Sequence, residues 1–172
     1  MEGRGRQEKG RRMIKPEDYF DLVMKGFAHV TPAESEEMTV LTEDIFKLRW
    51  MTRVRFSSFI AMADSLDETM MRQYMMACVQ MSKKGRSKLG EPIVCNGVVM
   101  SGDVSRGAAE YALRRPALHT TMDEYPIVVD LKAGQVHYYT GPILYGILYE
   151  KFEREYIDGH FALPARILAG KL

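Results

Sequence analysis

The residues best suited to chemistry are two aspartates and a lysine in the second half of the chain. Asp130 and Lys132 follow the apolar run 127–129, and Asp103 lies upstream, just before a segment with helical character. Two carboxylates can hold one or two divalent metal ions, and a lysine two residues after the second carboxylate can support an attacking water. This arrangement would suit metal-dependent cleavage of nucleic acid.

The same residues also have a simpler structural explanation. The Asp130–Lys132 tripeptide runs into a predicted hairpin turn, where polar residues are common, and Asp103 can cap the helix that follows it. The proline that usually precedes the first aspartate in nucleases of the PD-(D/E)xK type is missing. A nuclease that uses Asp103, Asp130 and Lys132 is therefore kept only as an alternative.

Other side chains that commonly carry chemistry form no recognisable site. The histidines are His29, His119, His137 and His160. No two of them are four residues apart and no cysteine pair lies near them, which argues against zinc. The sequence also lacks a P-loop, a GxGxxG motif after a strand and a GxSxG motif. We predict no enzyme, no metal, no cofactor and no small-molecule substrate.

The strongest pattern is the alternation in the segment 46–56, FKLRWMTRVRF. With a period of two, the apolar face carries Phe46, Leu48, Trp50, Thr52, Val54 and Phe56. The other face carries Lys47, Arg49, Met51, Arg53 and Arg55. Successive side chains of a strand point to opposite faces, so the segment is predicted to be one half-buried β-strand with the only tryptophan in the core. Its cationic face either pairs with neighbouring acids or contacts an anionic partner such as membrane head groups or nucleic acid.

Charge is also concentrated at the N-terminus. Residues 1–15 carry six basic and two acidic side chains, and the other 157 residues carry 18 basic and 21 acidic ones. With no apolar residue between Met1 and Met13, this segment is expected to be a disordered basic arm. A further cluster, Lys83 to Lys88, is predicted to lie in a loop and to join one cationic surface if the fold brings the three elements together.

The remaining 16–172 are expected to form a single globular domain. No apolar run is long enough to cross a bilayer and no hydrophobic leader follows the basic start, so we expect neither a transmembrane segment nor secretion. Cys78 and Cys95 lie in apolar stretches and are expected to be reduced and buried, with a disulfide as the alternative. Thirteen methionines fit either core packing or self-association.

Local signals place the elements along the chain. Helices are predicted from Pro16 to near Gly26, from Thr31 onward, over 59–81 with a kink near Asp64 and a capping box at 65–68, over 105–115, and over 143–156 with Gly159 as its end. Strands are predicted over 92–100, with a bulge or turn at Asn96-Gly97, and over 127–131 and 136–139 as a hairpin around Gly134. The apolar segment 74–81 could instead be a strand, and the C-terminal tail from His160 is expected to dock on the body.

This order of features resembles that of rhabdovirus matrix proteins. The basic arm 1–15 is followed by the alternating strand 46–56, an alanine-containing helix at 57–64, the hairpin 127–139 and the helix 143–156. The length is similar to that of the shorter, plant-infecting members. The proline-rich late-domain motif of animal-infecting members is absent, so the resemblance does not extend to budding through that motif.

The resemblance implies an α+β fold, a single domain in which a twisted antiparallel sheet is flanked by helices. It also implies a non-enzymatic virion protein that self-associates, lies peripherally on membranes in the virion and host cytoplasm, and binds both anionic lipid and nucleocapsid, through nucleoprotein or nucleic acid. The residues expected at the anionic contact are Arg4, Arg6, Lys9, Arg11, Arg12, Lys47, Arg49, Arg53 and Arg55. The third possibility is a soluble adaptor that binds only protein and pairs its basic face internally.

Overall fold

The computed structural model describes residues 13–30, 32–35, 38–47, 52–84, 92–116, 118–119, 122–141 and 147–171. Within these residues one sheet contains β1 (Ala33–Ser35), β2 (Met38–Lys47), β3 (Thr52–Ala63), β4 (Ile93–Ser101), β5 (Leu118–His119), β6 (Met122–Asp130) and β7 (Gln135–His137). The helices are α1 (Pro16–Gly26), α2 (Glu68–Lys84), α3 (Arg106–Ala112), α4 (Ile147–Ile157), the π-helical turn η2 (Asp158–Ala162) and α5 (Leu163–Leu168).

The predicted α+β class and the helix-flanked sheet are confirmed, but the antiparallel arrangement is wrong at the centre of the sheet. The strand order is β1-β2-β3-β4-β6-β5, with β7 also pairing with β6. β2 and β3 form an antiparallel hairpin, whereas β3, β4 and β6 are parallel. The cause is the pair of helical crossovers: α2 carries the chain from β3 back to the start of β4, and α3 does the same between β4 and β6.

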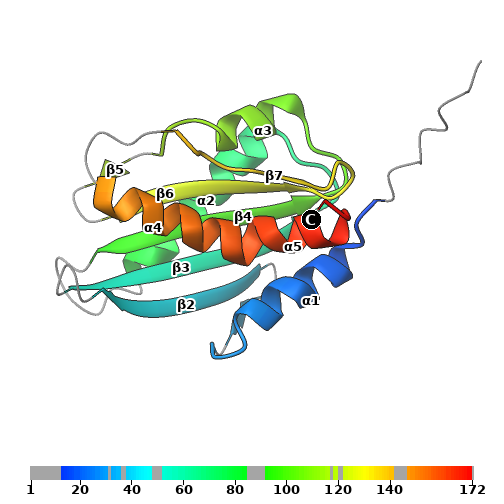
Figure 1. Cartoon of the computed structure of the whole chain (residues 1–172). Helices are drawn as coiled ribbons and strands as arrows, with labels where there is room; N and C mark the ends of the chain where they lie inside the picture. The colour runs from blue at the N-terminus through cyan, green and yellow to red at the C-terminus, as the bar shows by residue number, and fades with distance from the viewer. Residues whose placement is uncertain are drawn as a thin grey trace, which may run out of the picture.

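A layer of helices covers each face of the sheet (Figure 1). On one face α1, α4, η2 and α5 bury the larger core, which includes Tyr19, Phe56, Tyr125 and Phe161. On the other face α2 and α3 bury a second core that is rich in methionine, cysteine and valine. The apolar runs of β4 and β6 are buried on both sides, as is usual for parallel strands.

The alternating segment 46–56 is not one strand but the two arms of the β2–β3 hairpin. Phe46 on β2 lies opposite Arg53 on β3. Four residues of the predicted strand, Leu48, Arg49, Trp50 and Met51, fall outside the described residues. Because directly paired residues share a face, Phe46 lies on the same side as Arg53 and is 51% exposed, while Phe56 on the opposite face is fully buried. The prediction was wrong because it followed the alternation across a turn, where every second residue no longer lies on the same face of the sheet.

Several other boundaries differ from the sequence-based expectation. Residues 59–63 continue β3 instead of starting a helix, since α2 begins only at Glu68. Asp67, not Ser65, caps α2: its carboxylate accepts a hydrogen bond from the Met70 amide at 2.8 Å. Residues 33–35 form β1 rather than a helix, and Gly159 lies within η2 instead of ending the last helix, since η2 leads on into α5. The segment 74–81 is helical, as predicted, and not the alternative strand.

Other predictions are confirmed. α1 spans Pro16–Gly26, β6 and β7 pair around Gly134 at φ 57°, and the C-terminal tail docks with Phe161, Ala162 and Ala165 buried. The bulge or turn predicted at Asn96-Gly97 is wrong, since β4 pairs through both residues without interruption. A glycine is needed at position 97 because a Cβ there would lie 2.2 Å from the Met75 sulfur of α2.

The boundary of the basic arm moves toward the N-terminus. Ile14 is buried in the larger core, and its amide donates a hydrogen bond of 2.9 Å to the carbonyl of Leu131. Residues 13–15 therefore belong to the globular body. Residues 1–12, with Arg4, Arg6, Lys9, Arg11 and Arg12, lie outside the described residues.

Candidate anion-binding surface

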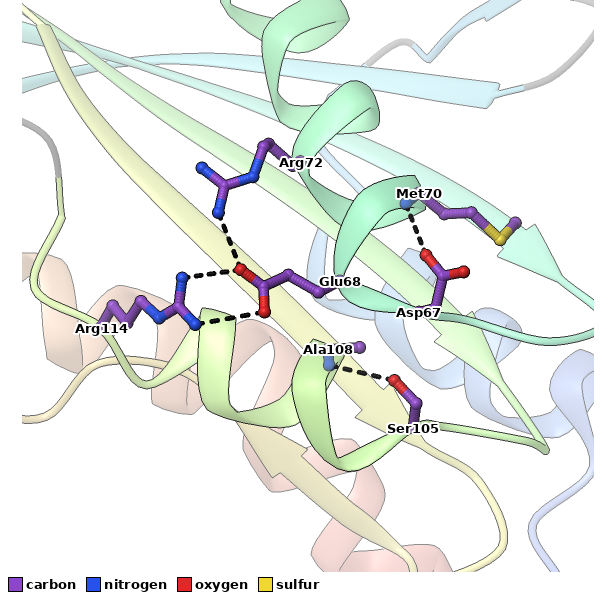
Figure 2. A network of polar contacts seen from close by, with 7 residues as sticks. All are labelled: Asp67, Glu68, Met70, Arg72, Ser105, Ala108 and Arg114. Atoms are coloured by element: carbon purple, nitrogen blue, oxygen red, sulfur yellow. Dashed lines mark hydrogen bonds and ion pairs between the residues drawn. The ribbon is translucent and has the colours of Figure 1, made fainter.

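An arginine-rich node joins the two helices of the α2/α3 layer (Figure 2). Glu68, in the first turn of α2, accepts hydrogen bonds from Arg72 at 2.7 Å and from both terminal nitrogens of Arg114 at 2.7 and 3.2 Å. The bonds from Arg114 and then Arg72 hold the pKa of the Glu68 carboxyl below its usual range. One carboxylate thus fixes two guanidinium groups, and the group of three keeps a net positive charge.

Caps and a backbone bridge hold this node in place. The Ser105 hydroxyl accepts a hydrogen bond from the Ala108 amide at 3.2 Å and starts α3, as Asp67 starts α2. Between the two caps, Leu66 and Val104 form a parallel bridge that continues the pairing of β3 and β4. The loops that lead into α2 and α3 are paired with each other, and this pairing fixes the position of Glu68 relative to the end of α3.

Both arginines lie close to the aromatic ring of Tyr111. The guanidinium carbon of Arg72 is 5.0 Å, and that of Arg114 5.6 Å, from the centre of the Tyr111 ring, within the range of cation–π attraction. These three side chains, with Arg115 and Glu124, line a cleft of about 230 Å³. The cleft offers planar guanidinium donors, which suit phosphate or carboxylate oxygens.

Exposed apolar side chains lie among these cations. Arg72, Met76 and Lys83 follow one another at helical spacing on the solvent side of α2, and all three are exposed. Met76 is 56% exposed and Leu113, just after α3, is 49% exposed. These two apolar side chains therefore lie beside the cations and can add contact area to them.

The two helical layers differ in charge. We use the name basic layer for α2, α3 and the residues that follow α3 up to Pro116. This layer contains two acidic side chains, Glu68 and Glu110, against six basic ones: Arg72, Lys83, Lys84, Arg106, Arg114 and Arg115. The opposite layer, residues 16–26 and 147–171, contains seven acidic and five basic side chains. The two helical layers therefore differ in net charge, +4 against −2, and the basic layer is the more positive of the two.

The predicted contact residues on β3 have different surroundings. Arg55 donates to both oxygens of Asp44 on β2, at 2.8 and 3.0 Å, and this bond lowers the pKa of Asp44. Arg55 is thus paired across the hairpin. Arg53 is exposed on the sheet face that α2 and α3 cover. The side chain of Lys47 and all of Arg49 lie outside the described residues.

Lys83 and Lys84 end α2 instead of lying in a loop. Because α2 runs antiparallel to β3 and β4, it ends near the N-terminal end of β3, where Arg53 is the second residue. The fold therefore brings part of the basic strand, Arg53, and part of the lysine cluster, Lys83 and Lys84, to the same end of the sheet. The third predicted cationic element, the arm, lies outside the described residues apart from 13–15.

The candidate nuclease residues lie at the end of the sheet where the central parallel strands finish. Asp103 follows β4 and Asp130 ends β6, so both are at the carboxyl ends of neighbouring parallel strands, with exposed Lys132 in the next turn. However, one Asp130 oxygen accepts a 2.7 Å hydrogen bond from the amide of Ala133 and so shapes the β6–β7 turn. Within the part of the chain that the structure describes, no three histidine, cysteine or acidic side chains are close enough to hold a metal.

A buried polar cluster under β2 was not predicted from the sequence. Glu43 on β2 is 8% exposed and accepts a hydrogen bond from the Tyr156 hydroxyl at 2.5 Å, while its other oxygen contacts Nε2 of His29. His160 stacks on Phe27, with ring centres 4.3 Å apart, and burial lowers the pKa of its imidazole. The only signal in the sequence is that Glu43 stands two residues after Leu41 and two residues before Ile45, so in a strand it shares a face with two apolar side chains.

The cysteines and the remaining histidines fit structural roles. Cys78 and Cys95 are both free and buried, and burial raises the pKa of each thiol, so neither is a reactive nucleophile. Burial also lowers the pKa of His137 on β7. The side chain of His119 lies outside the described residues.

A second buried carboxyl, Glu153 on α4, makes stability depend on pH. It is 2% exposed and accepts a 2.5 Å hydrogen bond from the Tyr125 hydroxyl, and burial raises its pKa to about 8. Between the ordinary pKa and about 8 the folded state keeps a proton that the unfolded state releases, so stability falls as pH rises through this window.

We expect Glu153→Gln to raise Tm by at least about 3 °C at pH 8 and to change it little at pH 5. The amide oxygen can still accept the bond from Tyr125 but carries no charge. The measurement is thermal unfolding followed by circular dichroism at both pH values. Glu155→Gln, on a largely exposed neighbour, is the control. An equal effect of Glu153→Gln at both pH values would contradict the assignment.

No helix among the described residues combines the length and the apolar character needed to span a membrane. Comparison of the chain with protein-family models, with curated proteins and with solved structures found no match.

Proposed function

We propose that this chain is a matrix-type structural protein of a virus, which docks peripherally on anionic membrane in the virion and host cytoplasm, self-associates, and binds nucleocapsid without catalysing a reaction. The observation that supports the proposal best is the charge difference between the two helical layers. The basic layer has six basic against two acidic side chains, and the opposite layer has more acids than bases. Such an asymmetry orients a protein on a negatively charged surface.

The size of the expected attraction is sufficient for reversible docking. Each lysine or arginine held near an anionic bilayer contributes about 1 kcal/mol, and the effect falls off within a Debye length. The net excess of four cations on the basic layer therefore corresponds to about 4 kcal/mol before apolar contacts are added. Met76 and Leu113, both about half exposed, supply those contacts, and the basic N-terminal arm adds further charge.

The experiment that tests the proposal is flotation of the purified chain with phosphatidylserine liposomes over a salt series. We expect binding at low salt that fades steeply as salt rises, and no binding to phosphatidylcholine liposomes. The same series with single-stranded RNA as competitor separates lipid from nucleic acid as the preferred anion. Absence of binding to both at low salt would contradict the proposal and would favour an adaptor that binds only protein.

The nuclease alternative is supported by one observation, the position of Asp103 and Asp130 at the ends of adjacent parallel strands. We expect no cleavage of single- or double-stranded nucleic acid in the presence of magnesium or manganese, because the Asp130 carboxylate is used by the turn. The assay compares the wild-type chain with Asp130→Ala. Metal-dependent cleavage that Asp130→Ala abolishes would establish the nuclease and remove the non-enzymatic assignment.

A further inference from the structure

Most of the outer edge of β2 is open. β1 pairs only with residues 38–40 of β2, so among the described strands none lies beside the outer edge of Leu41–Lys47 (Figure 1). The inner edge of the same stretch pairs with β3 without interruption, from Thr39 opposite Ile60 to Lys47 opposite Thr52. The open edge is thus a regular strand without a bulge or a proline, the type of edge that accepts another strand.

A groove follows this open edge. It has a volume of about 580 Å³ and is lined by every residue of β2 from Thr42 to Phe46 and by His29 and Val30. Five consecutive strand residues point alternately to the two faces of the sheet, so a groove that touches all five must run along the edge. Its shape therefore fits an extended chain segment.

The charges on the edge do not oppose such a segment. Exposed charged side chains commonly protect edge strands by repulsion or by hydration. Here the Glu43 carboxylate is buried against Tyr156 and His29, and the Asp44 carboxylate is held by Arg55. Beside them, Phe46 exposes 51% of its surface. An aromatic side chain at an open edge favours pairing over protection.

Two copies of this edge can pair without like charges opposite each other. In an antiparallel pair of two β2 strands with a two-fold axis through Ile45, Asp44 of each copy lies opposite Phe46 of the other. The same register makes the two Phe46 positions diagonal neighbours on one face, a distance that aromatic side chains can bridge. An axis through Asp44 instead places the two Asp44 residues opposite each other, and like charges that lie directly opposite destabilise a strand pair.

We propose that two copies of this chain pair through the open edges of β2, antiparallel and with the two-fold axis at Ile45, so that the sheet continues across the dimer. The inference rests on the self-association in the proposed function and names its surface. It places the interface at the β2 edge of the sheet, at the opposite end of the strand order from β5 and β7. Phe46 lies opposite Arg53, so this interface borders the cationic end of the basic layer, and separate assays for pairing and for membrane docking tell the two apart.

The test is sedimentation of the full chain over a concentration series. We expect a monomer–dimer equilibrium that Phe46→Lys weakens about tenfold or more, since the change acts twice across the axis. Met62→Lys is the matched control, because Met62 is 63% exposed near the other end of the hairpin. In the proposed register, a short bismaleimide should link Phe46→Cys chains but not Met62→Cys chains, since the native cysteines are buried.

Three outcomes would overturn the inference. A chain that stays monomeric at all concentrations but still floats with liposomes would remove the β2 pairing and leave membrane docking intact. Dimers that Phe46→Lys does not weaken and that bismaleimide does not link would show association through another surface. A monomer that binds an added extended basic peptide along β2 would show that the edge accepts a different partner.

Discussion

Replacing Lys83 and Lys84 with glutamate should weaken binding to phosphatidylserine liposomes at least about 30-fold, because the loss of two cations that contribute about 1 kcal/mol each already accounts for this factor. Both side chains are exposed in the last turn of α2, near the N-terminal end of β3, which carries Arg53. Reversal adds two repelling charges to the loss. The measurement is liposome flotation at low salt, with the salt slope determined for each variant.

The opposite helical layer provides a matched control. Lys25 on α1 and Lys151 on α4 are also exposed, and their replacement by glutamate changes the net charge of the chain by the same amount. We expect the Lys25→Glu/Lys151→Glu variant to keep most of the binding. Equal losses in the two double variants would mean that only net charge matters and would remove the basic layer as the docking surface.

Phe56→Ala should destabilise the fold by about 3–5 kcal/mol, whereas Phe46→Ala should cost much less, within about 1 kcal/mol. Phe56 is fully buried, stacks on Tyr156 at a centroid distance of 4.1 Å and meets the edge of Phe152 at 5.3 Å. Its removal opens a cavity between β3 and α4. Phe46, in contrast, already exposes half of its surface.

Urea denaturation of the two variants beside the wild-type chain measures this difference. The comparison is sharp because an uninterrupted strand over 46–56 would place both phenylalanines on one buried face. Similar losses in the two variants would contradict the hairpin and support that single strand. The measurements are made at low protein concentration, because Phe46 also lies on the proposed dimer edge and self-association would otherwise add to the apparent stability.

Several elements could be predicted because their signals are local. Pro16 at the first position of α1 and the left-handed Gly134 in the β6–β7 turn depend only on backbone preferences that a few neighbouring residues determine. The long apolar run of β4 likewise identified a fully buried strand. Its near-continuous apolar character is also typical of parallel pairing, because strands of parallel sheets are buried on both faces.

The elements that were predicted wrongly depend on contacts distant in the sequence. The alternation over 46–56 contains no glycine or proline to mark a turn, so only the pairing of β2 with β3 reveals that the chain reverses there. The stretch 59–63 has apolar residues compatible with a helix or a strand. It becomes a strand because β2 and β4 pair with it on both sides.

The sequence by itself determined the α+β class, the basic character of the chain start, the helix α1, the buried strand β4 and the absence of a recognised catalytic motif, because composition and local periodicity are sufficient for these. Only the tertiary structure decided which cations act together. It pairs Arg55 with Asp44, gathers Arg72 and Arg114 around Glu68, and leaves Lys83 exposed. The reason is that the effect of a charge depends on its neighbours in space, and residues 46 positions apart in the chain, such as Glu68 and Arg114, become neighbours only through the crossovers of the sheet.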